Sequence, residues 1–207
     1  MSSRILSLTV LISGLVIVAL LAGCATVDQK INLNYTTAER SFGHNGGDIA
    51  VSRKDSRSDT RNSKGEWIIG SINNVHGVHQ ADLVSDRNVG EWITDALLLE
   101  LKKAGYSVTY TADLPASAAR GIMITDINAF LNVNQGAISD EIKHELKFNI
   151  EIFLNGMKTK TFTVSSRENK TLPLSASKEE KEKIMLQALQ DAIQQIIPEI
   201  NTLTGKK

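Results

Sequence analysis

Residues 141–154 read EIKHELKFNIEIFL and form the longest alternation of apolar and polar side chains in the chain. The even positions are apolar except for His144, and the odd positions up to Glu151 are charged or carry an amide. Successive side chains of a strand point to opposite faces, so this period of two predicts a strand with one face on a core and one in water. We expect it to be long and antiparallel to its neighbours.

Further strands flank this run on both sides. Asn155 and Gly156 follow it directly and are a typical pair for a two-residue hairpin turn. Phe162 and Val164 then resume the alternation, which predicts a returning strand. Shorter β-type stretches precede it at residues 31–35, 48–51, 66–70, 106–110 and 122–133. Residues 71–85 are interpreted as a connection, and residues 53–65, which lack any apolar side chain, as an exposed mobile loop.

Two segments have helical spacing instead. In residues 86–104 apolar side chains recur at steps of three and four, with Ser85 or Asp86 placed to cap the start and Gly105 to end the helix. Residues 177–198 open with capping-box spacing and close at a proline, which predicts a kink or an end. The apolar stripe of this second helix contains Ile184, Met185, Ala188, Leu189, Ala192, Ile193, Ile196 and Ile197. A surface helix normally uses such a stripe to cover its own sheet, so a core role is favoured over docking.

The order of these elements predicts an α+β fold, with a mostly antiparallel sheet and two amphipathic helices packed on one face. We expect a single α+β periplasmic domain over residues 31–203 and a polar tail over residues 204–207. The length suits one domain with a substantial core.

The first 23 residues are typical of a leader rather than of the fold. A basic start at Arg4 precedes an apolar run over residues 5–22, and the run ends in Leu-Ala-Gly-Cys. This ending resembles the lipobox of bacterial lipoproteins, whose cysteine is acylated and becomes the mature N-terminus. An uncleaved transmembrane anchor is disfavoured because serine and glycine interrupt the run and the only cysteine of the chain sits at the cleavage motif. We therefore predict a signal peptide over residues 1–23, lipidation of Cys24, and a short acylated tether over residues 24–30.

The residue after the cysteine bears on localisation. It is Ala25 and not the aspartate that, by the same resemblance, commonly retains enteric-type lipoproteins in the inner membrane. We expect a lipid-anchored protein on the periplasmic face of the outer membrane, held by acyl chains on Cys24. With 23 acidic and 23 basic side chains the sequence predicts no basic face and no nucleic-acid partner.

No residue cluster is typical of an active site, and we predict a protein that is not an enzyme and binds no cofactor or metal. His76 and His79 have a spacing found in metal sites, but no further ligand accompanies them, so solvated loop histidines are expected. His144 lies on the apolar side of the long strand, where a neutral, hydrogen-bonded histidine is the usual outcome. The glycine-rich residues 41–47 lack the lysine of a phosphate loop and predict a turn.

Asp55, Arg57 and Asp59 form the most interesting polar group. A D-x-R-x-D stretch after a strand suits an ion-pair corner that stabilises a turn, worth at most about 1 kcal/mol when exposed. Binding of a partner is the alternative, and it makes these three side chains the candidate partner-binding site.

Several stretches together resemble the YajG-type outer-membrane lipoproteins. The matching pieces are the lipobox and residues 55–59, 98–106 and 131–136, while residues 67–79 form a longer insertion than that family leads us to expect. The resemblance implies an α/β lipoprotein domain without established catalytic residues, and a distant likeness to auxiliary lipoproteins of envelope lipid-transport systems.

Two hypotheses for function follow. The first is a membrane-anchored periplasmic lipoprotein that acts as a non-enzymatic binding or scaffolding module with an envelope protein as partner. The alternative is an auxiliary lipoprotein subunit of an ABC-type lipid-transport system, which would bind a lipid or a transporter in a groove between a helix and the sheet.

Overall fold

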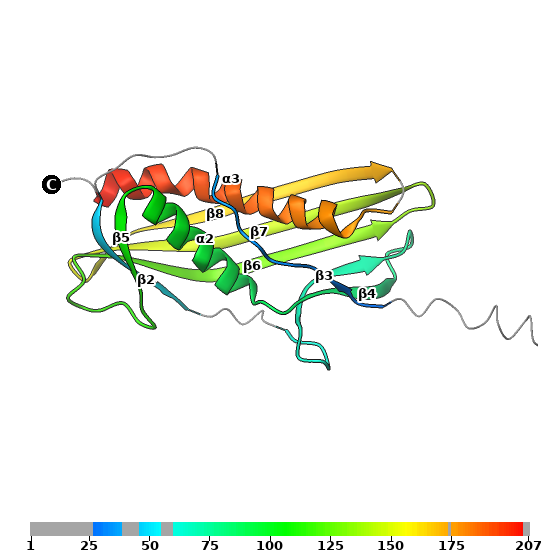
Figure 1. Ribbon diagram of the computed structural model, residues 1–207, viewed down its shortest axis with the longest axis horizontal. Helices are drawn as coiled ribbons and strands as arrows, with labels where there is room; N and C mark the ends of the chain where they lie inside the picture. Colours follow the sequence, from blue (N-terminus) through cyan, green and yellow to red (C-terminus); the bar gives the residue numbers. More distant parts are fainter. Residues whose placement is uncertain (1–26, 39–45, 55–59, 174, 205–207) are drawn as a thin grey trace, which may run out of the picture.

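The computed structural model describes residues 27–38, 46–54, 60–173 and 175–204, which form one mixed sheet with two helices in front of it (Figure 1). The elements in chain order are β1 (Gln29–Lys30), β2 (Gly47–Arg53), β3 (Trp67–Asn73), β4 (His79–Ser85), α2 (Val89–Lys103), β5 (Tyr106–Tyr110), β6 (Arg120–Gln135), β7 (Ser139–Leu154), β8 (Met157–Pro173) and α3 (Lys178–Thr204). The α+β class predicted from the sequence is confirmed.

The long alternating run is the centre of the sheet. It forms β7, which pairs antiparallel with β6 on one edge and with β8 on the other. The even side chains from Ile142 to Ile152 are buried, including His144, while the odd ones face away from the helices and remain at least partly exposed. The predicted hairpin turn is also confirmed, because Asn155 and Gly156 have φ values of 51° and 75°, as a two-residue turn of this hand requires.

The other edge of β6 carries two separate strands. Strand β2 pairs with residues 121–124 and β3 with residues 131–134, both in parallel. A bulge between Thr125 and Asn128, with Asp126 at φ 52°, separates the two pairings. Strand β5 then extends β2, while β4 and β1 extend β3, so the sheet forks at the bulge.

The prediction of a mostly antiparallel sheet is wrong for the sheet as a whole. Of its seven pairings four are parallel, namely β1 with β4, β2 with β5, β2 with β6, and β3 with β6. Only the β6–β7–β8 meander and the β3–β4 hairpin are antiparallel. The reason is physical: alternation along a strand reports its two faces, whereas the direction of its neighbour depends on the connection between them.

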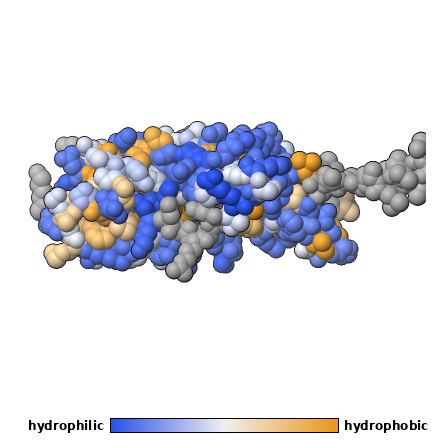
Figure 2. Space-filling view, turned by 90° about the horizontal axis from the view of Figure 1, so that it is seen from below, coloured by the Kyte–Doolittle hydropathy of each residue, from blue (hydrophilic) through white to orange (hydrophobic). Residues whose placement is uncertain are grey.

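Both helices cover the same face of the sheet, as predicted. Helix α3 packs on β7 and β8, α2 packs on β2, β5 and β6, and the two helices contact each other. Every residue predicted for the apolar stripe of α3 is buried. Among the described residues no helix packs on the opposite face of the sheet. Seen from below, at 90° to the view of Figure 1, the molecule has mostly hydrophilic surface, with hydrophobic surface at both ends of the long axis (Figure 2).

The helix boundaries differ in detail from the prediction. Helix α2 starts three residues later, because the side chain of Asn88, not Ser85 or Asp86, accepts hydrogen bonds from the backbone N–H groups of Gly90 and Glu91. The predicted capping box of α3 is confirmed by reciprocal bonds between Ser177 and Glu180 at 2.8 and 3.2 Å. Helix α3 continues through Pro198 to Thr204, so of the two predicted effects of the proline, a kink or an end, the end is excluded.

Residues 31–38, which we name the N-terminal strap, are not a strand. Ile31 and Leu33 are buried, as the alternation predicts. After β1, however, the chain forms no further strand pairing in residues 31–38 and crosses the two helices instead. The Tyr35 hydroxyl donates to Glu100 of α2 at 2.8 Å, and Gln190 of α3 donates to the carbonyl of Thr36 at 2.8 Å. The strap therefore ties the start of the described chain to both helices.

Residues 66–85 are a hairpin rather than one strand and a connection. Strand β3 pairs antiparallel with β4, and the turn lies over residues 74–78. A side chain on Gly70 would meet the carbonyl oxygen of Leu131 at 2.2 Å, so glycine allows β3 to lie directly against β6.

Candidate functional site: a cavity beside the N-terminal segment

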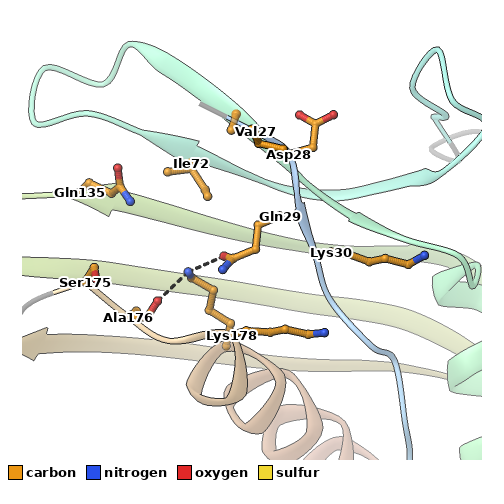
Figure 3. Close-up of a pocket in the computed structure, with 11 residues that line it drawn as sticks. Val27, Asp28, Gln29, Lys30, Ile72, Gln135, Ser175, Ala176 and Lys178 are labelled. Atoms are coloured by element: carbon orange, nitrogen blue, oxygen red, sulfur yellow. Dashed lines mark hydrogen bonds between the residues drawn. The ribbon is translucent and has the colours of Figure 1, made fainter. Parts of the chain in front are cut away.

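A cavity of about 480 Å³ lies where β1 passes the start of α3 (Figure 3). We name it the β1–α3 cavity. Its lining comes from the N-terminal segment, the β3–β4 hairpin, the end of β6 and the β8–α3 connection, and comprises Val27, Asp28, Gln29, Lys30, Ile72, Ala81, Gln135, Ser175, Ala176, Lys178 and Lys181.

Lys181 is the buried cation of this cavity. It sits in the first turn of α3 with only 2% of its surface exposed. Its ammonium donates to the amide oxygen of Gln29 at 2.6 Å and to the carbonyl of Ala176 at 2.8 Å. Burial lowers the pKa of Lys181, while the nearby carboxylates of Asp140 and Glu180 act in the opposite direction.

Asp140 is a buried anion on the neighbouring strand. It lies at the start of β7 and accepts a hydrogen bond from the backbone N–H of Ala176 at 2.8 Å. Ala176 is thus held from both sides, by Asp140 at its N–H and by Lys181 at its carbonyl. These two charges fix the connection that carries Ser175 and Ala176 into the cavity wall.

The rim of the cavity carries polar side chains, two of which have hydrogen-bond or ion-pair partners. Asp28 accepts from the backbone N–H of Asp82 at 3.2 Å, and Lys30 forms an ion pair with Asp86 at 2.6 Å. Gln135 and Lys178 complete the rim with an amide and a second ammonium. The lining offers hydrogen-bond donors and acceptors beside the apolar side chains of Val27, Ile72, Ala81 and Ala176, so the cavity can hold a group that has both polar and apolar parts.

A second cavity, of about 420 Å³, lies between one side of α2 and the ends of β2 and β5. Its lining is mostly charged and hydroxylated, and consists of Arg53, Arg87, Glu91, Thr94, Asp95, Leu98 and Tyr110. Arg87 pairs with Asp95 across it. The apolar side chains of α2 that face the sheet are buried in the core instead.

Of the residues singled out from the sequence, His76, His79 and His144 are described by the structure, and none of them lines either cavity. Cys24, Asp55, Arg57 and Asp59 lie outside the described residues, as do residues 41–45 of the glycine-rich stretch.

His76 and His79, which we expect to be solvated loop histidines rather than metal ligands, lie in the β3–β4 hairpin. His76 is exposed in the turn, and His79 lies 3.3 Å from Asp82 with about half of its side chain exposed. Within the described ranges no group of three or more histidine, cysteine, aspartate or glutamate side chains is placed to hold a metal ion.

His144 is fully buried, yet neither ring nitrogen has a hydrogen-bond partner among the described residues. The predicted burial is confirmed, and the predicted hydrogen bond is not found. Burial lowers the pKa of this imidazole to about 4, which keeps it neutral at ordinary pH. It lines neither of the two cavities.

Sequence reasoning missed Lys181, Asp140 and Gln29. A signal existed for Lys181, because it stands three and four residues before Ile184 and Met185 and so belongs to the buried stripe of α3. For Asp140 and Gln29 the sequence carries no comparable signal, because their partners are distant in the chain.

Taken together, the described residues define a two-layer α+β protein with one face of its sheet uncovered and a polar cavity next to its N-terminal segment. Residues 37–202 match the family described as uncharacterized lipoprotein, and the chain belongs to this family. No curated protein matches the sequence.

Several solved structures are similar in outline. A protein from Xanthomonas campestris has 12% identity and a TM-score of 0.47, with 88% of this chain and 100% of that chain covered. A minor lipoprotein from Acinetobacter baumannii has 13% identity and a TM-score of 0.46 over 78% and 94% of the two chains. The rare lipoprotein B from Shewanella oneidensis has 10% identity and a TM-score of 0.37 over 66% and 98%. Scores this low support no inference about this chain.

Over the part of the chain that the structure describes, no helix combines the length and apolar character needed to cross a membrane.

Proposed function

We propose that this protein is a lipoprotein held by acyl chains on Cys24 at the periplasmic face of the outer membrane, where it acts as a non-enzymatic binding or scaffolding module of the envelope. The YajG-type family is the finer identity that we propose within the lipoprotein family. The observation that supports binding most directly is the β1–α3 cavity, an open recess whose wall at Ala176 is held by the buried side chains of Lys181 and Asp140.

The composition of this cavity argues for binding rather than for catalysis. Its lining contains no histidine or cysteine, and the ammonium of Lys181 is already engaged by two oxygen acceptors. A nucleophile such as the hydroxyl of Ser175 would need a base within hydrogen-bond reach, and no hydrogen bond from Ser175 to a base is found among the described residues. A partner presenting a polar side chain or backbone group fits this lining better than a reacting substrate does.

A photo-crosslinking amino acid placed at Gln135, on the rim of the cavity, tests this role. We expect a discrete crosslinked product in intact envelopes, and a much weaker one from the same amino acid at Thr163, an exposed position in the middle of β8. Equal yields at the two positions, or none at Gln135, would contradict a binding role for the cavity.

The transport-subunit alternative is less well supported. It requires an apolar groove between α2 and the sheet, but Trp92, Ile93 and Leu97 are buried in the core. The cavity between α2 and the ends of β2 and β5 is lined mainly by charged side chains. Native mass spectrometry of the purified protein distinguishes the two hypotheses. We expect no stoichiometric phospholipid or fatty acid beyond the acyl chains on Cys24, whereas about one bound lipid per chain would favour transport.

A further inference from the structure

Four exposed apolar side chains gather at one end of the molecule. Of the eight large hydrophobic side chains exposed among the described residues, Val27 is 76% exposed, Val75 62%, Val78 57% and Ile138 81%. They come from three separate segments: the start of the described chain, the β3–β4 turn and the β6–β7 turn. We name these four side chains the apolar tip.

The register of the sheet places these segments together. Strands β3 and β6 run in parallel with Asn73 beside Asn134, so the turns that follow them leave the sheet at the same end. Strand β1 is parallel to β4 with Gln29 beside Leu83, so Val27 lies toward the start of β4, where the β3–β4 turn ends. The N-terminal segment and both turns accordingly lie at the same end in Figure 1, the right-hand one.

This end is also the one that leads to the predicted anchor. Cys24 and Val27 are three residues apart, a contour length of at most about 11 Å. That is comparable to the depth of about 5–10 Å at which apolar side chains sit in a membrane interface. An acylated Cys24 would therefore hold the apolar tip within reach of the lipid surface.

The opposite end of the molecule is a less well supported membrane contact. The opposite end also has hydrophobic surface (Figure 2), and Met157 lies there at the start of β8, but the described chain does not start at that end. What sets the apolar tip apart is its position beside the segment that continues to the lipid anchor.

We propose that Val27, Val75, Val78 and Ile138 insert into the surface of the anchoring phospholipid membrane, so that the molecule stands on this end with the β1–α3 cavity close to the lipid. This inference rests on the proposed anchoring through Cys24. It adds a second membrane contact and a fixed orientation, neither of which follows from a flexible tether alone.

Depth-dependent fluorescence quenching tests the proposal. The full-length acylated protein is reconstituted into phosphatidylethanolamine–phosphatidylglycerol vesicles, with an environment-sensitive fluorophore on Ile138→Cys, on Val75→Cys or, as a matched control, on Met157→Cys. The natural cysteine does not compete for the label when it is acylated. We expect phospholipids brominated near the headgroup to quench the labels at 138 and 75 at least about twofold more than the label at 157, given the insertion depth of interfacial side chains.

A second variant separates insertion from mere proximity. In a protein labelled at Ile138→Cys, the added changes Val75→Ser and Val78→Ser should reduce the quenching toward the level of the Met157→Cys control. Unchanged quenching, or equal quenching at all three labelled positions, would overturn the proposal. Flotation of the protein with vesicles is measured first, because a protein that fails to float contradicts the acyl anchoring itself, whereas one that floats without selective quenching contradicts only the apolar tip.

Discussion

The buried imidazole of His144 gives the stability of this protein a pH dependence. Its pKa is about 4 in the folded protein and near 6.5 in an unfolded chain. Between these values the unfolded chain binds a proton that the folded chain does not. The free energy of unfolding is therefore retained above pH 6.5 and falls as the pH drops toward 4, by up to about 1.4 kcal/mol per pH unit.

Replacing this side chain should remove that dependence. We expect the denaturation midpoint of His144→Leu to fall less than that of the wild type between about pH 7 and pH 4.5, because no buried imidazole has to be protonated. The exposed His76 provides the control, and His76→Asn should follow the wild type. If His144→Leu retained the full wild-type slope, the imidazole would not be the group that titrates.

Loss of the buried charge of Lys181 should lower the stability of the protein. Lys181→Met removes the donor to Gln29 and Ala176 and leaves Asp140 without its nearby positive charge, so we expect a loss of about 1–3 kcal/mol. Lys178→Met, which removes only a partly exposed ion pair with Glu182, should change stability by about 0.5 kcal/mol or less. Chemical denaturation of the two variants measures the difference, and equal losses would mean that Lys181 does not organise the cavity.

At the scale of elements, the N-terminal strap is the least conventional part of the fold. Leu33 is buried where the strap crosses the helices, and the guanidinium of Arg87 donates to its carbonyl at 3.2 Å. Leu33→Ala should therefore cost about 2–5 kcal/mol, whereas Asn34→Ala, at the exposed neighbouring position, should cost about 0.5 kcal/mol or less. Urea denaturation tests this. Similar midpoints for the two variants would mean that the strap contributes little to the fold.

The strap also illustrates what a sequence pattern predicts. The alternation of Ile31 and Leu33 correctly indicated which side chains are buried, but a period of two does not specify whether the surface beneath is a sheet or a pair of helices. Conversely, the long alternation of β7 was enough to predict both the strand and its buried face. A period of two that continues over most of a 16-residue strand fits no other regular structure. Short stretches depend on tertiary partners, and these are distant in sequence.

Whether neighbouring strands pair in parallel or antiparallel could not be predicted from the sequence for a related reason. Hairpins are signalled locally, as by Asn155 and Gly156, so the β7–β8 pairing was predictable. The parallel pairing of β3 with β6 joins residues about sixty positions apart, and it depends on the close approach at Gly70. A lone glycine in a β-type stretch indicates at most that some backbone comes near.

At the scale of the whole molecule, two features of the candidate site share one end. The β1–α3 cavity and the apolar tip both include Val27, and the N-terminal segment forms part of each. The sequence alone predicted the anchor from the Leu-Ala-Gly-Cys motif, but not the cavity, because its buried charges come from β7 and α3 and its amide from β1. The N-terminal segment that follows the predicted Leu-Ala-Gly-Cys motif thus lines a cavity whose other wall is formed by the start of α3.

The proposed function depends above all on the acylation of Cys24, since the orientation of the molecule and the placement of the cavity follow from it. Incorporation of radiolabelled palmitate in cells that express the wild type or Cys24→Ala measures this directly. We expect label in the wild-type protein and none in Cys24→Ala, which should persist as an uncleaved or mislocalised precursor. Equal labelling of the two proteins, or no label in the wild type, would contradict it.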